Sequence, residues 1–392
     1  MNASEILASV HTCGLDNTTN NTSCSEDVTK APFSKTLQIT MTSFYVIVFI
    51  TSILGNGLGL RIVLRTSSVN SFSCLLIGNK AFADLLTTIF TTPYMVFYLH
   101  NQNVWFGGVA GTITCKLSQF PFAVSLAASV FTVVIISIDR FIAVVYPLQR
   151  RRFLPNPKTT TLIIWILSVA VMLAPYLIPY RAIQMPNGQY HCGPQWGEYE
   201  RTIKIQKLFY MALFILMYVI PLVLTVIALS SVVRRLWRRK IPGHSSKVYR
   251  RAAQKANRQI AKLLIFIMVV FAICWAPVHM MHFLAFEAEW KQISAWVVML
   301  SFWLCHANSA IDPFLYIICN YSFRREIENT VSKCCTMNCD LKRKSSSYTF
   351  NGFTSRVVPS KNNKCCSLKG QREMAVMHDN NLFLQLPQTL LQ

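Results

Sequence analysis

The chain has 392 residues, of which 53% are hydrophobic and only 14% are charged. Because soluble globular domains carry about 25% charged residues, this composition argues against an ordinary soluble enzyme and favours a membrane protein. The 38 basic and 16 acidic residues give a formal net charge of +22. The basic residues gather in short polar stretches between apolar runs, which is typical of cytoplasmic loops, so no nucleic acid is expected as a partner.

The N-terminal segment, residues 1–38, is polar and carries four glycosylation sequons. It lacks the apolar stretch that a cleavable signal peptide requires. The sequons begin at Asn2, Asn17, Asn20 and Asn21. Their density predicts a glycosylated extracellular N-terminus, and the alternative is an Asn- and Thr-rich tail without regular structure.

Seven apolar stretches follow, and each exceeds the roughly 20 residues that a membrane-spanning helix needs. A bilayer offers the backbone no water, so each stretch is predicted to satisfy its own hydrogen bonds as an α-helix. The stretches run over 39–64, 72–98, 113–145, 159–180, 206–233, 260–286 and 292–319. The sequence therefore predicts an all-α membrane protein whose seven-transmembrane helix bundle occupies residues 39–320.

Lysine and arginine concentrate in alternate links between these stretches, most densely over 234–258. By the positive-inside rule these links and the C-terminus face the cytoplasm, while the N-terminus faces outward, as in a multi-pass protein of the plasma membrane. A transporter or channel is the competing class. The sequence shows neither the repeats nor the paired broken helices of many transporters.

The predicted spans carry polar residues and prolines at places that lipid alone does not favour. The motifs are, in chain order, Gly55-Asn56, Asn79 to Asp84, Asp139-Arg140-Phe141, Trp165, Pro221, Cys274-Trp275-Ala276-Pro277 and Asn308 to Tyr316. In this order, over about residues 40–330, they resemble the rhodopsin-like (class A) G-protein-coupled receptors. The resemblance implies a receptor that activates a heterotrimeric G protein. No nucleophile–base pair that would indicate an enzyme is evident.

The resemblance also implies a path for the signal between the ligand and the G protein. Its residues are Asp139, Arg140, Trp275, Pro277, Asp312, Pro313 and Tyr316. Asp139 can hold Arg140 by a charge-assisted hydrogen bond, and in the family this arginine is released on activation to meet the G protein. The alternative is an arginine that snorkels at a helix end. Pro221, Pro277 and Pro313 each remove a helical hydrogen bond and predict kinks.

Two further sites follow from the resemblance. The family joins the positions of Cys115 and Cys192 by a disulfide that ties the link between spans 4 and 5 across the ligand mouth. It also places a sodium ion among oxygen-bearing side chains, which here are Asp84, Ser129, Asn308 and Asp312. Oxygen ligands suit a hard cation, and the alternative is a hydrogen-bonded network around a protonated Asp84. Beyond this allosteric sodium ion no cofactor is expected.

The ligand is predicted from residues near the outer ends of the spans. Phe122 stands where amine receptors keep an aspartate, which argues against a monoamine, and the turn signal at 186–188 predicts a β-hairpin. Acidic Glu198, Glu200, Glu287 and Glu289 suit a basic or amidated peptide. The residues expected to line the cavity are Gln119, Phe122, Trp275, His279, His282, Trp303 and His306. The chain is similar in these respects to neuropeptide receptors of the RFamide, neuropeptide Y and tachykinin groups; a lipid, nucleotide or other small-molecule ligand is the alternative.

Several positions depart from the family pattern. Leu229 stands where many members have a tyrosine that helps to stabilise the active state, and leucine cannot form that hydrogen bond. Asn257 offers no carboxylate to lock Arg140, which predicts some basal activity. Lys80 replaces a leucine and is expected to snorkel at the inner end of its span. Phe141 replaces a tyrosine, with little expected effect.

The C-terminal part is expected to leave the membrane interior. Residues 321–336 resemble the short amphipathic eighth helix of the family, and residues 337–392 are predicted to be a disordered cytoplasmic tail. Cys334 and Cys335 are palmitoylation candidates that would anchor this part to membrane lipid. Hydroxyl side chains over 345–349 are phosphorylation candidates for the recruitment of arrestin.

Overall fold

The computed structural model describes residues 33–65, 72–146, 155–238, 247–286 and 294–319. All of them lie in the first of two units, Met1–Val331, while the second unit is Ser332–Gln392. Several sequence predictions lie outside the described residues and stay predictions. They concern Asn2, Asn17, Asn20, Asn21, Glu287, Glu289, Cys334, Cys335, the eighth helix and the tail.

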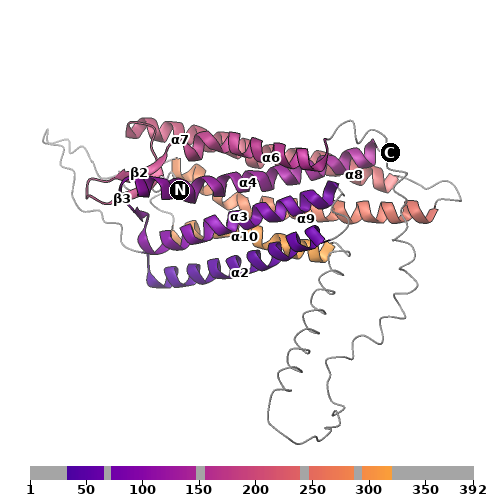
Figure 1. Ribbon diagram of the computed structural model, residues 1–392, viewed down its shortest axis with the longest axis horizontal. Coiled ribbons are helices and arrows are strands. Elements are labelled where there is room, and N and C mark those ends of the chain that lie inside the picture. The colour runs from indigo at the N-terminus through magenta and orange to yellow at the C-terminus, as the bar shows by residue number, and fades with distance from the viewer. Residues whose placement is uncertain (1–32, 66–71, 147–154, 239–246, 287–293, 320–392) are drawn as a thin grey trace, which may run out of the picture. The chain divides into compact units, whose positions relative to one another are not determined.

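Long helices that run side by side make up most of the described structure (Figure 1). They are α2 (Lys35–Arg65), α3 (Phe72–Asn101), α4 (Gly108–Val145), α6 (Pro157–Met172), α7 (Tyr199–Phe214), α8 (Ile220–Arg238), α9 (Lys247–Phe286) and α10 (Ala295–Cys319). Two short π-helical segments, η2 (Leu173–Leu177) and η3 (Ile215–Val219), extend α6 and join α7 to α8. Within the described ranges the chain therefore forms seven helical rods, as predicted.

The distribution of apolar side chains is that of a membrane bundle. Six helical stretches of the described chain are long and apolar enough to cross a membrane, and α10 falls short because polar residues such as Asn308 and Asp312 interrupt it. Leu54 and Leu208 are 67% and 69% exposed, whereas Asp84 is 1% exposed. Apolar side chains outside and polar ones inside suit lipid as the solvent. The prediction of an all-α membrane protein is confirmed.

Two of the rods are not uniform α-helices, and a proline lies in or shortly after each of their π segments. The N–H of Ile220 donates to the carbonyl oxygen of Ile215, five residues back instead of four, and Pro221 follows without an N–H of its own. In η2, which contains Pro175, the N–H of Ile178 donates to Leu173 O over 3.1 Å. A missing donor leaves a helical carbonyl unpaired, and a π turn is one way in which the chain accommodates it.

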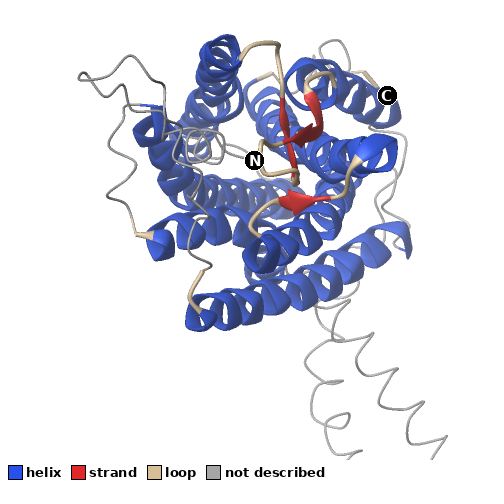
Figure 2. Cartoon of the chain, turned by 90° about the vertical axis from the view of Figure 1, so that its left-hand side faces the viewer, coloured by secondary structure: helices blue, strands red, loops and turns tan. Residues whose placement is uncertain are grey.

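A small antiparallel sheet lies across one end of the bundle (red in Figure 2). Its strands are β1 (Val104–Trp105), β2 (Tyr180–Gln184) and β3 (Tyr190–Pro194), in the order β1-β3-β2. Gly188, with φ of +81°, occupies the turn between β2 and β3 and donates its N–H to Met185 O over 2.9 Å. The predicted hairpin is confirmed. We call this end of the bundle the hairpin end, and the opposite end, where α4 carries Asp139 and Arg140, the Arg140 end.

A glycine sets the closest approach between α2 and α10. A Cβ atom added to Gly55 would lie 2.6 Å from Cβ and 2.7 Å from Cγ of Pro313. Side-chain carbons do not approach one another so closely, so only glycine allows the two backbones to pack at this distance. The same crossing places Asn56 so that its Nδ2 donates to Ser309 O over 2.8 Å.

Candidate functional site

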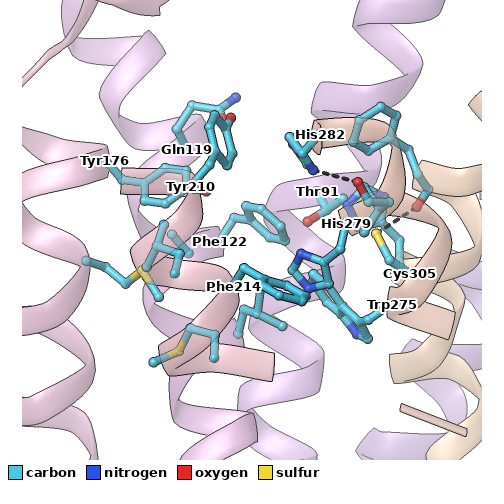
Figure 3. A pocket seen from close by; sticks show the side chains of 18 of the residues that line it. Thr91, Gln119, Phe122, Tyr176, Tyr210, Phe214, Trp275, His279, His282 and Cys305 are labelled. Atoms are coloured by element: carbon cyan, nitrogen blue, oxygen red, sulfur yellow. Dashed lines mark hydrogen bonds between the residues drawn. The ribbon is translucent and has the colours of Figure 1, made fainter. Parts of the chain in front are cut away.

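A cavity of about 140 Å³ lies among α3, α4, α7, α9 and α10 (Figure 3). The predicted residues that line it are Gln119, Phe122, Trp275, His279, His282 and His306. They come from α4, α9 and α10, which the bundle brings together from positions far apart in the sequence. The structure thus brings these six side chains together around one cavity, while their contact with a ligand stays a prediction.

Other predicted ligand residues lie elsewhere. Trp303 is not among the residues that line the cavity; its ring packs against Phe44 of α2, with centroids 5.2 Å apart. In the described structure Trp303 therefore packs toward α2, and its contact with a ligand stays a prediction. Glu198 precedes the first turn of α7 as an exposed cap residue and does not line the cavity either. The backbone of Glu200 belongs to α7, but its side chain is outside the described part.

Aromatic residues that the sequence did not single out form much of the wall. Tyr210 stacks on His282 with ring centroids 4.5 Å apart, and Phe214 meets His279 edge-on at 5.0 Å. Both rings project from α7, as Figure 3 shows. A tyrosine or phenylalanine in an apolar span usually faces lipid or fills a core, so spacing alone did not indicate these residues.

The wall of the cavity carries no Asp, Glu, Lys or Arg among the described residues that line it. Its polar character comes instead from neutral groups. Three of them, Gln119 Nε2, Trp275 Nε1 and Thr91 Oγ1, are buried and have no hydrogen-bond partner within the described structure. A buried donor without a partner costs roughly 1–3 kcal/mol. The described protein itself thus leaves these three neutral groups without a hydrogen bond.

The hairpin is fixed to the helix bundle by a disulfide between Cys115 and Cys192. Cys115 lies in the second turn of α4, and Cys192 lies in β3, where it pairs with Ala182 of β2. Both cysteines are fully buried and pack with Tyr180. The bond that the family resemblance implied is confirmed, and it holds the sheet close to the helix that contributes Gln119 and Phe122 to the cavity.

A charged cluster is buried in the middle of the bundle. Lys80 Nζ donates to Asp84 Oδ2 over 2.9 Å, to Ser129 Oγ over 3.0 Å and to Asp312 Oδ2. Ser129 Oγ in turn donates to Asp84 Oδ1 over 2.7 Å. The side chain of Lys80 is only 2% exposed. The expectation that Lys80 snorkels is wrong, because Asp84 lies one helical turn away on the same face and offers the ammonium a buried acceptor.

This cluster contains three of the four residues expected to bind sodium. The fourth, Asn308, is buried, and its Oδ1 has no hydrogen-bond partner in the described residues. It lines a separate cavity of about 30 Å³ together with Lys80 and Ser129. Lys80 already donates to one carboxylate oxygen of Asp84 and one of Asp312, while Asp312 Oδ1 has no hydrogen-bond partner among the described residues. A sodium ion here would lie beside the Lys80 ammonium, and because like charges repel, these residues are a poor fit for an additional cation.

At the Arg140 end, the predicted ion pair within α4 is present. Arg140 donates from Nε over 3.1 Å and from Nη2 over 2.6 Å to Asp139 Oδ2. Asp139 is fully buried, and Arg140 is 8% exposed. Leu229 is also buried and packs in an apolar cluster with residues that include Leu264. The side chains of Asn257 and Tyr316 lie outside the described part of the chain.

The side chain of Asn79 links α3, α4 and α6 by hydrogen bonds. Asn79 of α3 donates from Nδ2 to Thr132 Oγ1 of α4 over 2.8 Å, and its Oδ1 accepts from Trp165 Nε1 of α6 over 2.9 Å. The sequence pointed to Asn79 and Trp165 as family motifs without connecting them. Their pairing gives both residues a structural role, since one amide holds α4 and α6 to α3.

Comparison with known proteins places these features in a family. Residues 55–316 match the 7 transmembrane receptor (rhodopsin family). The chain is 27% identical to the substance-K receptor of Mus musculus over 283 residues, which are 71% of this chain and 72% of that receptor. It is 29% identical to galanin receptor 2b of Danio rerio over 293 residues, 73% of each chain. Identity to the substance-P receptor of Rattus norvegicus is 28% over 295 residues, 74% of this chain and 70% of the relative.

The family match runs from the Gly55-Asn56 motif to Tyr316 and so includes the cavity, the buried charged cluster and the Asp139–Arg140 pair. It establishes a multi-pass membrane protein and a receptor class, in agreement with the prediction that the chain is no enzyme. The chain belongs to the rhodopsin family of seven-transmembrane receptors.

Proposed function

We propose that the protein is a plasma-membrane receptor that binds an extracellular peptide at the hairpin end and activates a heterotrimeric G protein at the Arg140 end. Three relatives are receptors named for substance K, galanin and substance P, and these names support a neuropeptide as the ligand. Basic residues are dense over 234–258, between the fifth and sixth spans, and occur again at 324–325. By the positive-inside rule they support a cytoplasmic location for the Arg140 end. The N-terminus is then extracellular.

The observation that carries this proposal is the cavity beneath a disulfide-tethered hairpin. Its wall is aromatic, offers unpartnered neutral donors and has no charged side chain among the described residues. Such a wall favours an uncharged part of a peptide, because a charged group would enter without a counter-ion. Of the basic and amidated peptides suggested by the sequence, an amidated end therefore suits the cavity better than a charged one.

The described rim also bears on the charge of the peptide. Arg181 of β2 and both Arg201 and Lys204 of α7 carry exposed or partly exposed basic side chains at the hairpin end, against the exposed carboxylate of Glu198. This part of the rim does not have the acidic character that would attract a basic peptide. We propose that the peptide contributes an uncharged, aromatic or aliphatic end to the cavity and that its remaining residues meet the hairpin.

The test is a screen of secreted-peptide sequences, each as a C-terminal amide and as a free acid, on cells that express the full chain. Calcium and cyclic-nucleotide responses are recorded. For each active sequence, we expect the C-terminal amide to be at least tenfold more potent than the free acid. Responses only to lipids or nucleotides would overturn the peptide proposal, and equal potency within pairs would overturn the neutral-cavity argument.

Two matched variants test whether the ligand binds in this cavity. Gln119→Leu removes a buried amide that lines it, and we expect roughly a tenfold loss of potency, since about 1.4 kcal/mol corresponds to a factor of ten. Gln206→Leu removes an amide that is also buried and unpartnered but does not line this cavity, and it should leave potency unchanged. An equal effect of the two substitutions would contradict the assigned binding site.

A further inference from the structure

The buried charged cluster points to a cation that is part of the chain itself. Lys80 and Asp84 come from α3, Ser129 from α4 and Asp312 from α10, and they meet where family resemblance implies sodium. We propose that the Lys80 ammonium permanently occupies the place of that sodium ion, so that the stability of this receptor does not depend on sodium.

The hydrogen-bond geometry supports a one-for-one replacement. A lysine ammonium has three N–H donors and no acceptor. The three acceptors, Asp84 Oδ2, Ser129 Oγ and Asp312 Oδ2, match these donors in number and lie on three different helices. Lys80 thus connects α3, α4 and α10 through oxygen atoms of three of the four residues expected to bind the ion.

The burial of two carboxylates favours a positive charge at this site. Asp84 is 1% exposed and Asp312 is fully buried, and a buried carboxylate requires a paired charge or a proton. Lys80 supplies a positive charge within hydrogen-bond reach of both carboxylates. A sodium ion on the same oxygens would lie next to the ammonium, and like charges repel strongly at such a distance in the interior of a protein.

Tethering makes the replacement permanent. A free ion leaves its site when its concentration falls, whereas an ammonium on the backbone of α3 remains at a high effective concentration in any salt. Movement of α10 away from α3 would require the hydrogen bond between Lys80 and Asp312 to break. In this receptor the link between these helices then responds to conformational change but not to the sodium gradient.

The test uses the purified full-length chain in detergent and needs no agonist. Thermal unfolding is measured in sodium chloride and in N-methyl-D-glucamine chloride at equal ionic strength. We expect the same midpoint for the wild-type chain in both salts. Lys80→Leu restores the residue typical of the family. The unfolding midpoint of this variant should be higher in sodium chloride by a few °C, on the order expected for a site largely filled by its ligand.

Controls separate this site from general effects of salt. Adding Asp84→Asn to Lys80→Leu should abolish the gained response, because one carboxylate ligand is lost. If Lys80→Leu does not fold, Lys80→Gln provides a neutral side chain that keeps the polar contacts and should show the same gain. A wild-type midpoint that rises specifically in sodium would overturn the proposal, as would a folded neutral variant that shows no sodium response.

Discussion

The close crossing of α2 and α10 permits a quantitative prediction from a pair of glycines. A Cβ added at Gly55 would lie 2.6 Å and 2.7 Å from two carbons of Pro313, whereas carbon atoms prefer about 3.5–4.0 Å. Gly55→Ala therefore forces the helices apart by about 1 Å at a rigid proline ring. Overpacking of this kind costs about 1–3 kcal/mol, and the higher helix propensity of alanine returns about 0.5–1 kcal/mol.

Gly57 is the matched control, because it lies in the same helix and a Cβ there would meet no atom within 4 Å. Gly57→Ala should therefore be stabilised by the higher helix propensity of alanine without any steric clash. Both variants have this gain in helix propensity. Their unfolding free energies should therefore differ only by the cost of overpacking, about 1–3 kcal/mol, with Gly55→Ala the less stable. At roughly 2–4 °C per kcal/mol, the midpoints should separate by several degrees.

The assay is thermal unfolding of the two purified variants and the wild-type chain in one detergent, followed by tryptophan fluorescence. Cell-surface amounts of each variant provide a second readout that does not depend on detergent. If Gly55→Ala unfolds at the same temperature as Gly57→Ala or above it, the contact with Pro313 does not limit the packing of α2 on α10, and the reasoning fails.

Three further predictions concern single contacts. Trp165→Phe removes the donor to Asn79 Oδ1 and should lower stability by about 1–3 kcal/mol, measured as a lower unfolding midpoint; an unchanged midpoint would contradict the role of the link. Cys192→Ser opens the bond to Cys115 across 77 residues and should cost about 4 kcal/mol; reduction of the wild-type disulfide should lower its midpoint similarly. Arg140→Ala should abolish ligand-stimulated nucleotide exchange on the G protein at unchanged surface amounts, and normal exchange would contradict its assignment.

Much of the architecture could be predicted because membranes impose simple rules on sequence. Apolar length predicted the helices, although α9 begins at Lys247 instead of near 260, since a helix continues into polar residues after the apolar stretch ends. The hairpin followed from local turn residues around Gly188. The pairing of Cys115 with Cys192 and the approach of Asp139 to Arg140 followed from family positions and from adjacency in the chain.

The errors arose where a side chain is oriented by residues distant in the sequence. Lys80 was expected to reach water, but Asp312, 232 positions away, provides a buried acceptor next to Asp84. Trp303 was expected to line the cavity, whereas its ring packs against Phe44 of α2. The contribution of Phe214 to the cavity was missed for the same reason.

The π segment before Pro221 has a consequence for how this span tolerates insertions and deletions. A π turn contains one more residue than an α turn, so η3 accommodates one extra residue without rotating α8 relative to α7. Tyr210 faces the cavity on one side of η3, and Leu229 faces the apolar core on the other. If the same residues formed a continuous α-helix, one part would be rotated relative to the other by about 100°, whereas loss of one residue within Ile215–Val219 would restore α spacing with both surfaces kept in place. The π segment therefore allows one span to direct Tyr210 toward the cavity and Leu229 toward the apolar core.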